Sequence, residues 1–330
     1  MAHNLTITKF GTAEFFYVGE KPWHGLGTEL PARATSRQAM KAAGLEWAVK
    51  TEPLYRKQHG RFAAIEEAVL TVRDDTDQIL GVVAPDYQII QTQQAFEFID
   101  ALVGESAAIF ETAGSLREGR RVFACAKLPG DLVITEGDVL SKYLFFISGH
   151  DGKMSFLVKF TGTRVVCENT SNIAISEATP RQSTIRHTGE INFKLDEVRR
   201  VLGLQLRYFT LFGEKARALS AKKISEAIAR TYFERVVPFP VGSDVTIAQV
   251  ERTRKLHDTF AFLFHEGRGN QLRGAKQTAW AAFNAITEWA DHVNVLTQKG
   301  EPKASGFENA LFGSGERLKQ DAWDKALALL

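Results

Sequence analysis

The chain has 330 residues, 44% hydrophobic and 24% charged, proportions that exclude a wholly disordered chain or a fibrous repeat and predict a packed core. The net charge of +2 is unevenly spread: −4 over residues 1–110, +8 over 111–276 and −2 over 277–330. A local excess of that size can attract a polyanion, although a solvated helical surface explains it equally well.

The N-terminal residues MAHNLTITKFGTAEFF lack the basic and apolar regions of a secretory signal, and no apolar run is long enough to span a bilayer. Cys125 and Cys167 have no CxxC spacing and no clustered histidines around them. No glycine-rich loop joins a strand to a phosphate-binding helix. We therefore expect a cytoplasmic protein without a disulfide framework, a metal site, a cofactor or a membrane partner.

Glycines and prolines interrupt residues 1–60, which predicts an irregular N-terminal segment packed on a sheet. One helix is expected there, over TSRQAMKAAGLEW, residues 35–47. Thr35 or Ser36 can cap it, because a side-chain oxygen at that position accepts hydrogen bonds from the free amides of the first turn.

Residues 61–185 predict an antiparallel sheet. Three pairs of apolar runs, over 62–84, 109–129 and 142–170, are each separated by a polar turn and read as hairpins. The third turns at GHDG, residues 149–152, where Asp-Gly is a strong tight-turn signal. A helix over residues 92–105 interrupts the strands, since its apolar residues fall on one helical face.

From residue 170 the pattern becomes helical. A first helix is expected over TSNIAISEA, residues 170–178, and longer helices over 195–219, 220–236, 247–266 and 275–293. In the last of these, core packing explains Trp280, whereas Asn284, if buried, needs a partner, either a structural hydrogen bond or a ligand contact. The predicted fold is α+β, a curved antiparallel sheet with interposed helices followed by a mainly helical C-terminal half, divided into residues 1–60, 61–185 and 186–330.

Basic side chains cluster near the predicted hairpins. Six belong to hairpins and two to the junction between sheet and helices: Arg117, Arg120, Arg121, Lys153, Lys159, Arg164, Arg181 and Arg186. Cations projecting from a sheet can follow a phosphate backbone and bind single strands with little sequence preference. These eight residues are the predicted nucleic-acid site, and ordinary solvation of a strand face is the alternative.

Two other segments combine unusual residues. Trp23 and His24 lie in PWHGLG, where they either contact a ligand or form an N-terminal cover on the sheet, and we favour the cover because tryptophan is usually buried. Cys167, Glu168 and Asn169 end a predicted strand, where a packed thiol and a helix cap explain them better than catalysis does.

Catalysis by Cys167 would need a converging base, and the sequence offers only scattered histidines such as His150 and His187. No paired-carboxylate spacing supports a metal site formed by Asp151 and Glu168. We therefore predict no catalytic residue and no metal ligand, and keep His187 as a ligand or structural residue.

Several segments together resemble the phage/plasmid-like protein family, a domain of unknown function found in phages, plasmids and integrated elements. The segments are PWHGLG at 22–27, Tyr87 with TQQAFEFID, AGSL before GRRVFA, HDG at 150–152, RVVCENT at 164–170, RHT at 186–188 and residues 280–292. The family's usual glutamine is Glu168 here, which weakens any role given to that position.

This resemblance implies a context of mobile DNA. By architecture the chain is also similar to single-strand annealing proteins of phage recombination such as RecT and Erf, an analogy of outline and context only. This similarity implies a protein that binds single-stranded DNA, assembles into a homo-oligomeric ring or filament, and anneals strands. Two alternatives stay open: an enzyme that uses the Trp23/His24 and Cys167/Glu168/Asn169 regions, and a protein-protein module such as an inhibitor of host defence.

Overall fold

The computed structural model describes residues 5–19, 25–31, 34–103, 109–164, 170–171, 182–185, 187, 195–294 and 313–330. The chain forms two compact units, and neither is contiguous in sequence. Unit 1 comprises Met1–Pro129, Tyr143–Phe160 and Gln182–Gln205. Unit 2 comprises Gly130–Lys142, Thr161–Arg181 and Leu206–Leu330.

The main sheet has nine strands in the described part of the chain, in the order β11-β10-β9-β7-β6-β1-β2, with β12 paired to β10 and β8 to β9. Most neighbours are antiparallel, whereas β1 and β2 are parallel. The strands are β1 (Phe15–Val18), β2 (Thr28–Leu30), β6 (Ile109–Leu116), β7 (Arg121–Lys127), β8 (Leu132–Thr135), β9 (Asp138–Gly149), β10 (Phe156–Arg164), β11 (Thr170–Ser171) and β12 (Gln182–Ile185).

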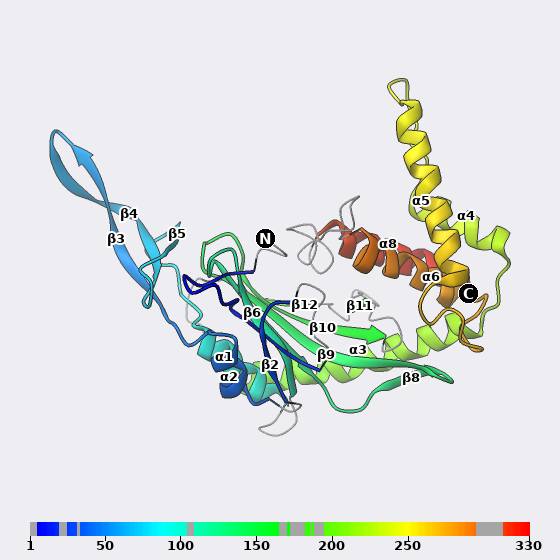
Figure 1. Ribbon diagram of the computed structural model, residues 1–330, viewed down its shortest axis with the longest axis horizontal. Helices are drawn as coiled ribbons and strands as arrows, with labels where there is room; N and C mark the ends of the chain where they lie inside the picture. The colour runs from blue at the N-terminus through cyan, green and yellow to red at the C-terminus, as the bar shows by residue number, and fades with distance from the viewer. Residues whose placement is uncertain are drawn as a thin grey trace. The chain divides into compact units, whose positions relative to one another are not determined.

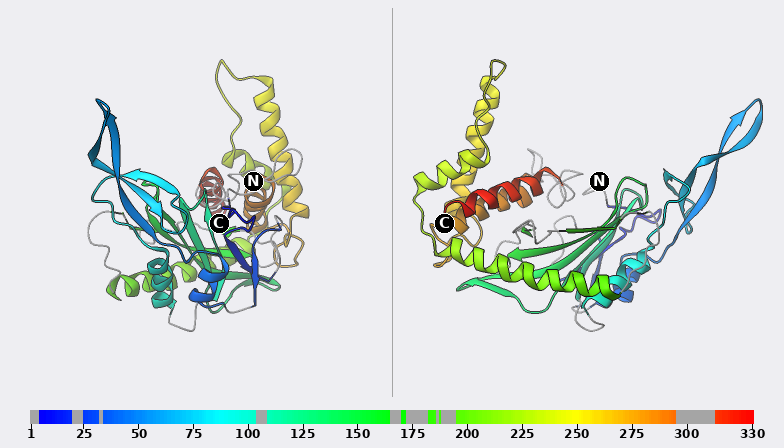
Figure 2. Two further views of the ribbon diagram at one scale, coloured as in Figure 1. Left: turned by 60° about the vertical axis from the view of Figure 1, so that its left-hand side comes forward. Right: turned by 180° about the vertical axis from the view of Figure 1, so that it is seen from behind.

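A second, antiparallel sheet in unit 1 has the order β3-β4-β5, from β3 (Val49–Gln58), β4 (Arg61–Arg73) and β5 (Ile79–Val83). β5 pairs only with Val69–Val72 of β4, so the outer part of the β3–β4 hairpin is a ribbon of two strands. Figures 1 and 2 show this ribbon projecting from the rest of unit 1.

Two helices pack within unit 1, α1 (Ser36–Ala42) and α2 (Thr92–Val103). The predicted cap of the first is confirmed: the Thr35 side chain accepts a hydrogen bond from the Gln38 amide, and the Gln38 side chain accepts one from the Thr35 amide. On the apolar face predicted for the second helix, Phe96 and Ile99 are buried. Its Phe96 stacks on Phe110 of β6, with ring centroids 5.0 Å apart, and meets Phe146 of β9 edge-on.

The C-terminal helices are α3 (Leu195–Ala221), α4 (Glu226–Val236), α5 (Ile247–Glu266), α6 (Ala279–Glu288) with its π-helical continuation η2 (Trp289–Val293), and α8 (Ser314–Leu327). Phe212 stacks on Trp323 at 4.8 Å, and Trp280 is fully buried. The Asn284 amide donates to the Trp280 carbonyl oxygen, which confirms the core role expected for this segment. No helix in the described part of the chain is both long and apolar enough to cross a membrane.

The mixed α+β class is confirmed, but two local predictions are wrong. Residues 1–60 were expected to hold one helix as their only regular element, but their described part also forms the strands β1, β2 and β3. Thr170–Ser171 is a strand paired with β10, so the expected helix does not begin at Thr170, and residues 172–178 lie outside the described part of the chain. Both errors concern strands held by distant partners, which local periodicity does not report. The division into residues 1–60, 61–185 and 186–330 stays a prediction.

Candidate nucleic-acid interface

The turn between β6 and β7 carries the first predicted cations. Arg117, Glu118 and Gly119 have consecutive positive φ angles of 54°, 60° and 90°. This conformation is unfavourable for the two non-glycine residues and persists only where the surroundings hold it. The Gly119 amide donates to the Thr6 hydroxyl at 3.1 Å, and Thr6 in turn bonds Ser115 at 2.6 Å. The N-terminal segment therefore fixes the turn, and Arg117 is exposed on it.

Arg120 ties the same turn to the second sheet. Its Nε donates to the carbonyl oxygen of Leu80 in β5 at 3.1 Å, and one of its terminal nitrogens pairs with Glu118 at 3.3 Å. The side chain stays 37% exposed. Arg120 is therefore positioned by the strand below it while part of its guanidinium faces solvent.

The turn between β9 and β10 approaches the same strand. A carboxylate oxygen of Asp151 accepts a hydrogen bond from the Lys153 amide at 3.0 Å, which shapes the turn. Gly81 of β5 lies so close that a Cβ there would be 2.7 Å from the Cα of Asp151. Because Gly81 has no side chain, the backbone of this turn can pack directly against β5. Lys153 follows in the same turn and is exposed.

The two turns border one open hollow of about 730 Å³, which we call the Arg117 hollow. Its lining residues are Leu5, Thr6, Ile7, Arg117, Glu118, Arg120, Asp151 and Lys153. Three of the eight predicted cations therefore meet, from hairpins about thirty residues apart in sequence. Two carboxylates among them leave the hollow with a modest net positive charge.

A second hollow of about 500 Å³ shares Thr6, Ile7 and Glu118 with the first. It adds Lys9 and Phe10, whose ammonium and ring lie 5.2 Å apart. Phe10 is 84% exposed. This cation and ring lie outside the basic middle section, so the charge pattern along the sequence did not mark them.

Of the other predicted cations only Arg121 has a described side chain, and it does not line the Arg117 hollow. Arg121 is half-buried on β7, opposite Leu116 and Gly149. The backbones of Lys159 and Arg164 lie in β10, but their side chains are outside the described part, as are Arg181 and Arg186 altogether. On the later helices Arg230 pairs with Glu226 and Asp258, and Arg254 with Glu251.

His187 has a structural environment. Its ring stacks on Tyr87 with centroids 4.7 Å apart, and Nδ1 donates to the Gln88 carbonyl oxygen at 2.9 Å. The Tyr87 hydroxyl donates to the Gly149 carbonyl oxygen at 2.9 Å. These contacts tie β9 to the segment after β5. Burial lowers the pKa of His187 below its ordinary value, and the ring does not face solvent as a general base would.

His150 is also unsuited to act as a base. It is 0% exposed, it meets Trp47 edge-on at 5.8 Å, and neither ring nitrogen has a hydrogen-bond partner in the described part of the chain. Burial, followed by the positive charges of His187 and Arg73, lowers the pKa of His150 to about 3. The imidazole is therefore neutral and closed to solvent.

A buried ion pair lies beside these rings, and the sequence analysis missed it. Arg73, 4% exposed, donates to both carboxylate oxygens of Glu14 at 2.7 and 3.1 Å and also binds Asp75. Its guanidinium lies 4.1 Å from the Trp47 ring centroid. Because the partners are 59 residues apart, no local signal marks this pair.

The structure gives no geometry for the catalytic alternative. Trp23, His24, Cys167, Glu168 and Asn169 all lie outside the described residues. Burial raises the pKa of the Cys125 thiol, which disfavours the nucleophilic thiolate. Within the described ranges no three His, Cys, Asp or Glu side chains gather as a metal site would require.

A protein-family model described as a domain of unknown function, DUF932, matches residues 79–312. The chain belongs to this family. The DUF932 match begins at β5 and contains both turns of the Arg117 hollow. No curated protein and no solved structure matches the chain.

A third basic feature precedes the DUF932 match, at the outer end of the β3–β4 hairpin. Residues 54–65, LYRKQHGRFAAI, which we call the arm, contain three Arg or Lys residues and no Asp or Glu. The arm was not predicted from the sequence, because the charges of residues 1–110 sum to −4 and this total hides a short basic segment. A shorter counting window would have found it.

Proposed function

We propose that this protein binds single-stranded nucleic acid and pairs strands within a mobile genetic element. The observation that carries the proposal is the meeting of Arg117, Arg120 and Lys153 around one open hollow. Cations held by two rigid turns can contact successive phosphates of a flexible strand without reading its bases. The resemblance of several segments to the phage/plasmid-like protein family supports the context of mobile DNA.

Strand annealing is the finer part of the proposal. An annealing protein holds a strand through its backbone and leaves the base edges available to a complement, so an open basic surface suits it better than a closed pocket. We propose single-stranded DNA as the ligand and a homo-oligomeric ring or filament as the working form. The alternatives are an enzyme of unknown reaction and an inhibitor of host defence, and a measurement of nucleic-acid binding separates both from strand annealing.

The test measures binding of a labelled single-stranded oligonucleotide, beside a duplex control, between about 50 and 200 mM salt. We expect salt-sensitive binding that prefers the single strand. An Arg117→Ala/Lys153→Ala variant should bind more weakly, with the slope of log affinity against log salt reduced by about 1.4, because each lost phosphate contact removes about 0.7. Bound complementary strands should then anneal without a nucleoside triphosphate.

The matched control is Arg254→Ala/Lys255→Ala on α5, which removes the same charge from an exposed helix. The control should bind as the unmodified protein does. Equal weakening in both variants would show a general charge effect and reject the Arg117 hollow as the site. No binding of the unmodified protein at low salt would reject the proposed function and favour the other two classes.

A further inference from the structure

The arm is built as a tight two-stranded ribbon. Gln58 pairs with Arg61, and the two residues between them, His59 and Gly60, have φ angles of 49° and 79°. Positive φ at both central positions is the type I′ geometry, whose twist matches that of the flanking strands. Pairing continues inward to Leu54 and Ile65, where the register shifts and three residues of β4, 66–68, have no partner in β3.

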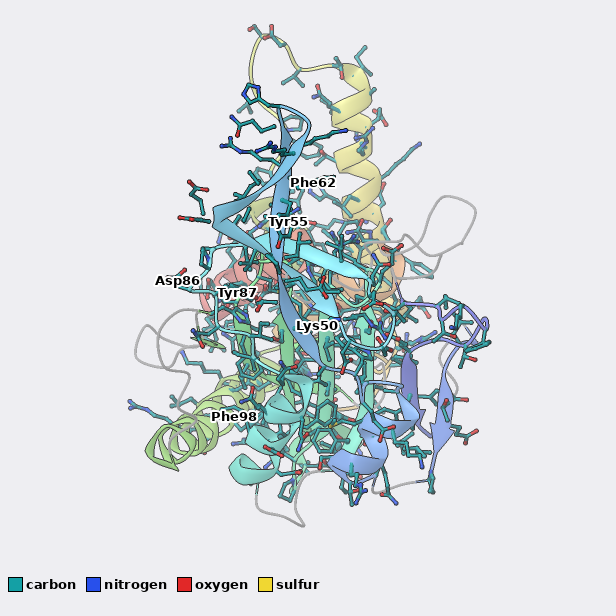
Figure 3. The ribbon with its side chains drawn as sticks, turned by 90° about the vertical axis from the view of Figure 1, so that its left-hand side faces the viewer. Lys50, Tyr55, Phe62, Asp86, Tyr87 and Phe98 are labelled. Carbon is teal, nitrogen blue, oxygen red and sulfur yellow. The ribbon has the colours of Figure 1, made fainter. Side chains whose placement is uncertain are left out.

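The two faces of the arm differ. Directly opposed residues in an antiparallel pair share a face, and the faces alternate along each strand. One face carries the pairs Tyr55 with Ala64 and Lys57 with Phe62. The two aromatic rings are therefore diagonal neighbours on one side of the ribbon, and Figure 3 shows both on it.

These rings contribute little to the core. Tyr55 is 55% exposed and Phe62 is 75% exposed. A two-stranded hairpin in water is marginally stable, and a cross-strand aromatic pair adds little to its stability, which leaves most of both ring surfaces open to a ligand. Aromatic side chains exposed next to a cation are the arrangement on which nucleic-acid bases stack.

The charge of the arm points to a polyanion. Arg56, Lys57 and Arg61 form no ion pair within the described part of the chain. The acidic residues lie at the base of the hairpin, where Glu52 pairs with Lys50 at 3.0 Å. Positive charge is therefore concentrated at the outer end, where Lys57 lies on the face of the rings and Arg56 and Arg61 lie on the opposite face.

We propose that the arm is a second contact for single-stranded nucleic acid: bases stack on Tyr55 and Phe62, Lys57 on the same face binds a neighbouring phosphate, and Arg56 and Arg61 on the opposite face add to the positive field of the arm. This inference rests on the proposed function and deepens it. Duplex bases are already stacked on one another, so the rings favour single strands. Charge complementarity favours this occupant over a second copy of the chain, whose arm carries the same positive charge.

Two arm variants separate the two kinds of contact. Tyr55→Leu/Phe62→Leu removes the rings but keeps apolar side chains on the strand, and Arg56→Gln/Lys57→Gln/Arg61→Gln removes the cations. Phe262→Leu on α5 is the matched control, because Phe262 is 62% exposed outside the arm. The substituted residues are exposed, so each variant should keep its fold, and far-UV circular dichroism checks this.

The ligands are DNA and RNA single strands of equal length that contain 2-aminopurine, whose fluorescence is quenched on stacking. The ring variant should lose roughly 10-fold or more in affinity together with the quenching, while its salt slope stays the same. The cation variant should reduce that slope by at least about 0.7, the contribution of the phosphate contact at Lys57. Phe262→Leu should change neither quantity.

Each contrary outcome has one meaning. If the unmodified protein binds and both arm variants bind equally well, the arm inference fails and the proposed function stands. If the unmodified protein binds neither strand, the proposed function fails with it. If the ring variant changes the elution volume in size-exclusion chromatography but not the affinity for either strand, the arm contacts another copy of the chain and the inference is overturned.

Discussion

His150 is held among groups that keep it neutral. Its ring meets Trp47, which also contacts the guanidinium of Arg73, and Arg73 is paired with Glu14. Protonation would place an unpaired cation inside unit 1, next to another positive charge. The HDG turn therefore contributes a buried ring, and the exposed chemistry of the segment belongs to Lys153.

This burial predicts a stability loss in mild acid. The pKa of His150 is about 3 in the folded protein, against about 6.5 in an unfolded chain, so the unfolded chain takes up the proton first as the pH falls. The stabilisation that comes from keeping His150 neutral is fully present above pH 6.5 and is lost as the pH falls toward 3. Between pH 7 and pH 5 the loss of this stabilisation should lower the free energy of unfolding by about 2 kcal/mol.

His150→Leu keeps a buried side chain of similar size and removes this titration. Urea unfolding at the two pH values should show a smaller loss on acidification in the variant, by about 2 kcal/mol. The loss that remains includes the part due to His187, whose pKa is also lowered. An identical loss in both proteins would show that His150 is solvated or paired in solution.

At the scale of elements, β5 connects the two turns of the Arg117 hollow. Leu80 accepts a hydrogen bond from Arg120, and the neighbouring Gly81 receives the backbone of Asp151. One short strand thus positions cations that belong to two different hairpins. The placement of Lys153 depends on a position in β5 that carries no side chain.

Gly81→Ala should therefore destabilise unit 1. The added Cβ would lie 2.7 Å from the Cα of Asp151 and 2.9 Å from its carbonyl oxygen, and backbone atoms cannot rotate away as a side chain can. Overpacking of this kind costs about 1–3 kcal/mol. Thermal unfolding of this variant beside Val82→Ala, at an exposed position of the same strand, measures the effect. Equal melting temperatures would show that the turn does not rest on β5.

Local patterns predicted the elements whose signals are local. The Thr35 cap, the apolar face of α2 and the turns at Arg117–Arg120 and Gly149–Gly152 each depend on neighbouring residues. β3 was missed because most of its side chains are exposed, which leaves no alternation of buried and exposed positions to detect. The arm was missed with it.

The same limit applies to the candidate site. Sequence placed Arg117, Arg120 and Lys153 on hairpin turns, and the structure places these turns at one hollow. The sequence could not show that they share β5 as a support, because this depends on the close approach of Gly81 to Asp151, 70 residues away. The buried pair of Arg73 with Glu14 was hidden for the same reason.

At the scale of the whole molecule, the C-terminal helices share unit 2 with a segment far earlier in the chain. Residues 130–142 supply Asp138, which accepts a hydrogen bond from the Trp280 indole at 2.9 Å, with both residues 0% exposed. They also supply Leu132, which packs where Gly213 of α3 has no side chain. The helical half therefore depends on this strand segment for part of its core.

A fragment of residues 206–330 should consequently be helical but poorly packed. Without residues 130–142 the Trp280 indole loses its acceptor, and an unsatisfied buried donor costs about 1–3 kcal/mol. We expect a helical far-UV spectrum without a cooperative thermal transition. In the full chain, Asp138→Leu should lower the free energy of unfolding by the same 1–3 kcal/mol. A fragment that melts as sharply as the full chain would contradict this account.

The outer arm also has a consequence for handling the protein. In the described part of the chain no third strand pairs with either edge of its two-stranded part, and such open edges are templates for β-pairing between molecules. Like charge on Arg56, Lys57 and Arg61 keeps two arms apart in dilute buffer. Salt shortens the reach of that repulsion, from about 10 Å at 0.1 M to about 3 Å at 1 M. Concentrated stocks should therefore stay monodisperse at low ionic strength and self-associate as salt is added.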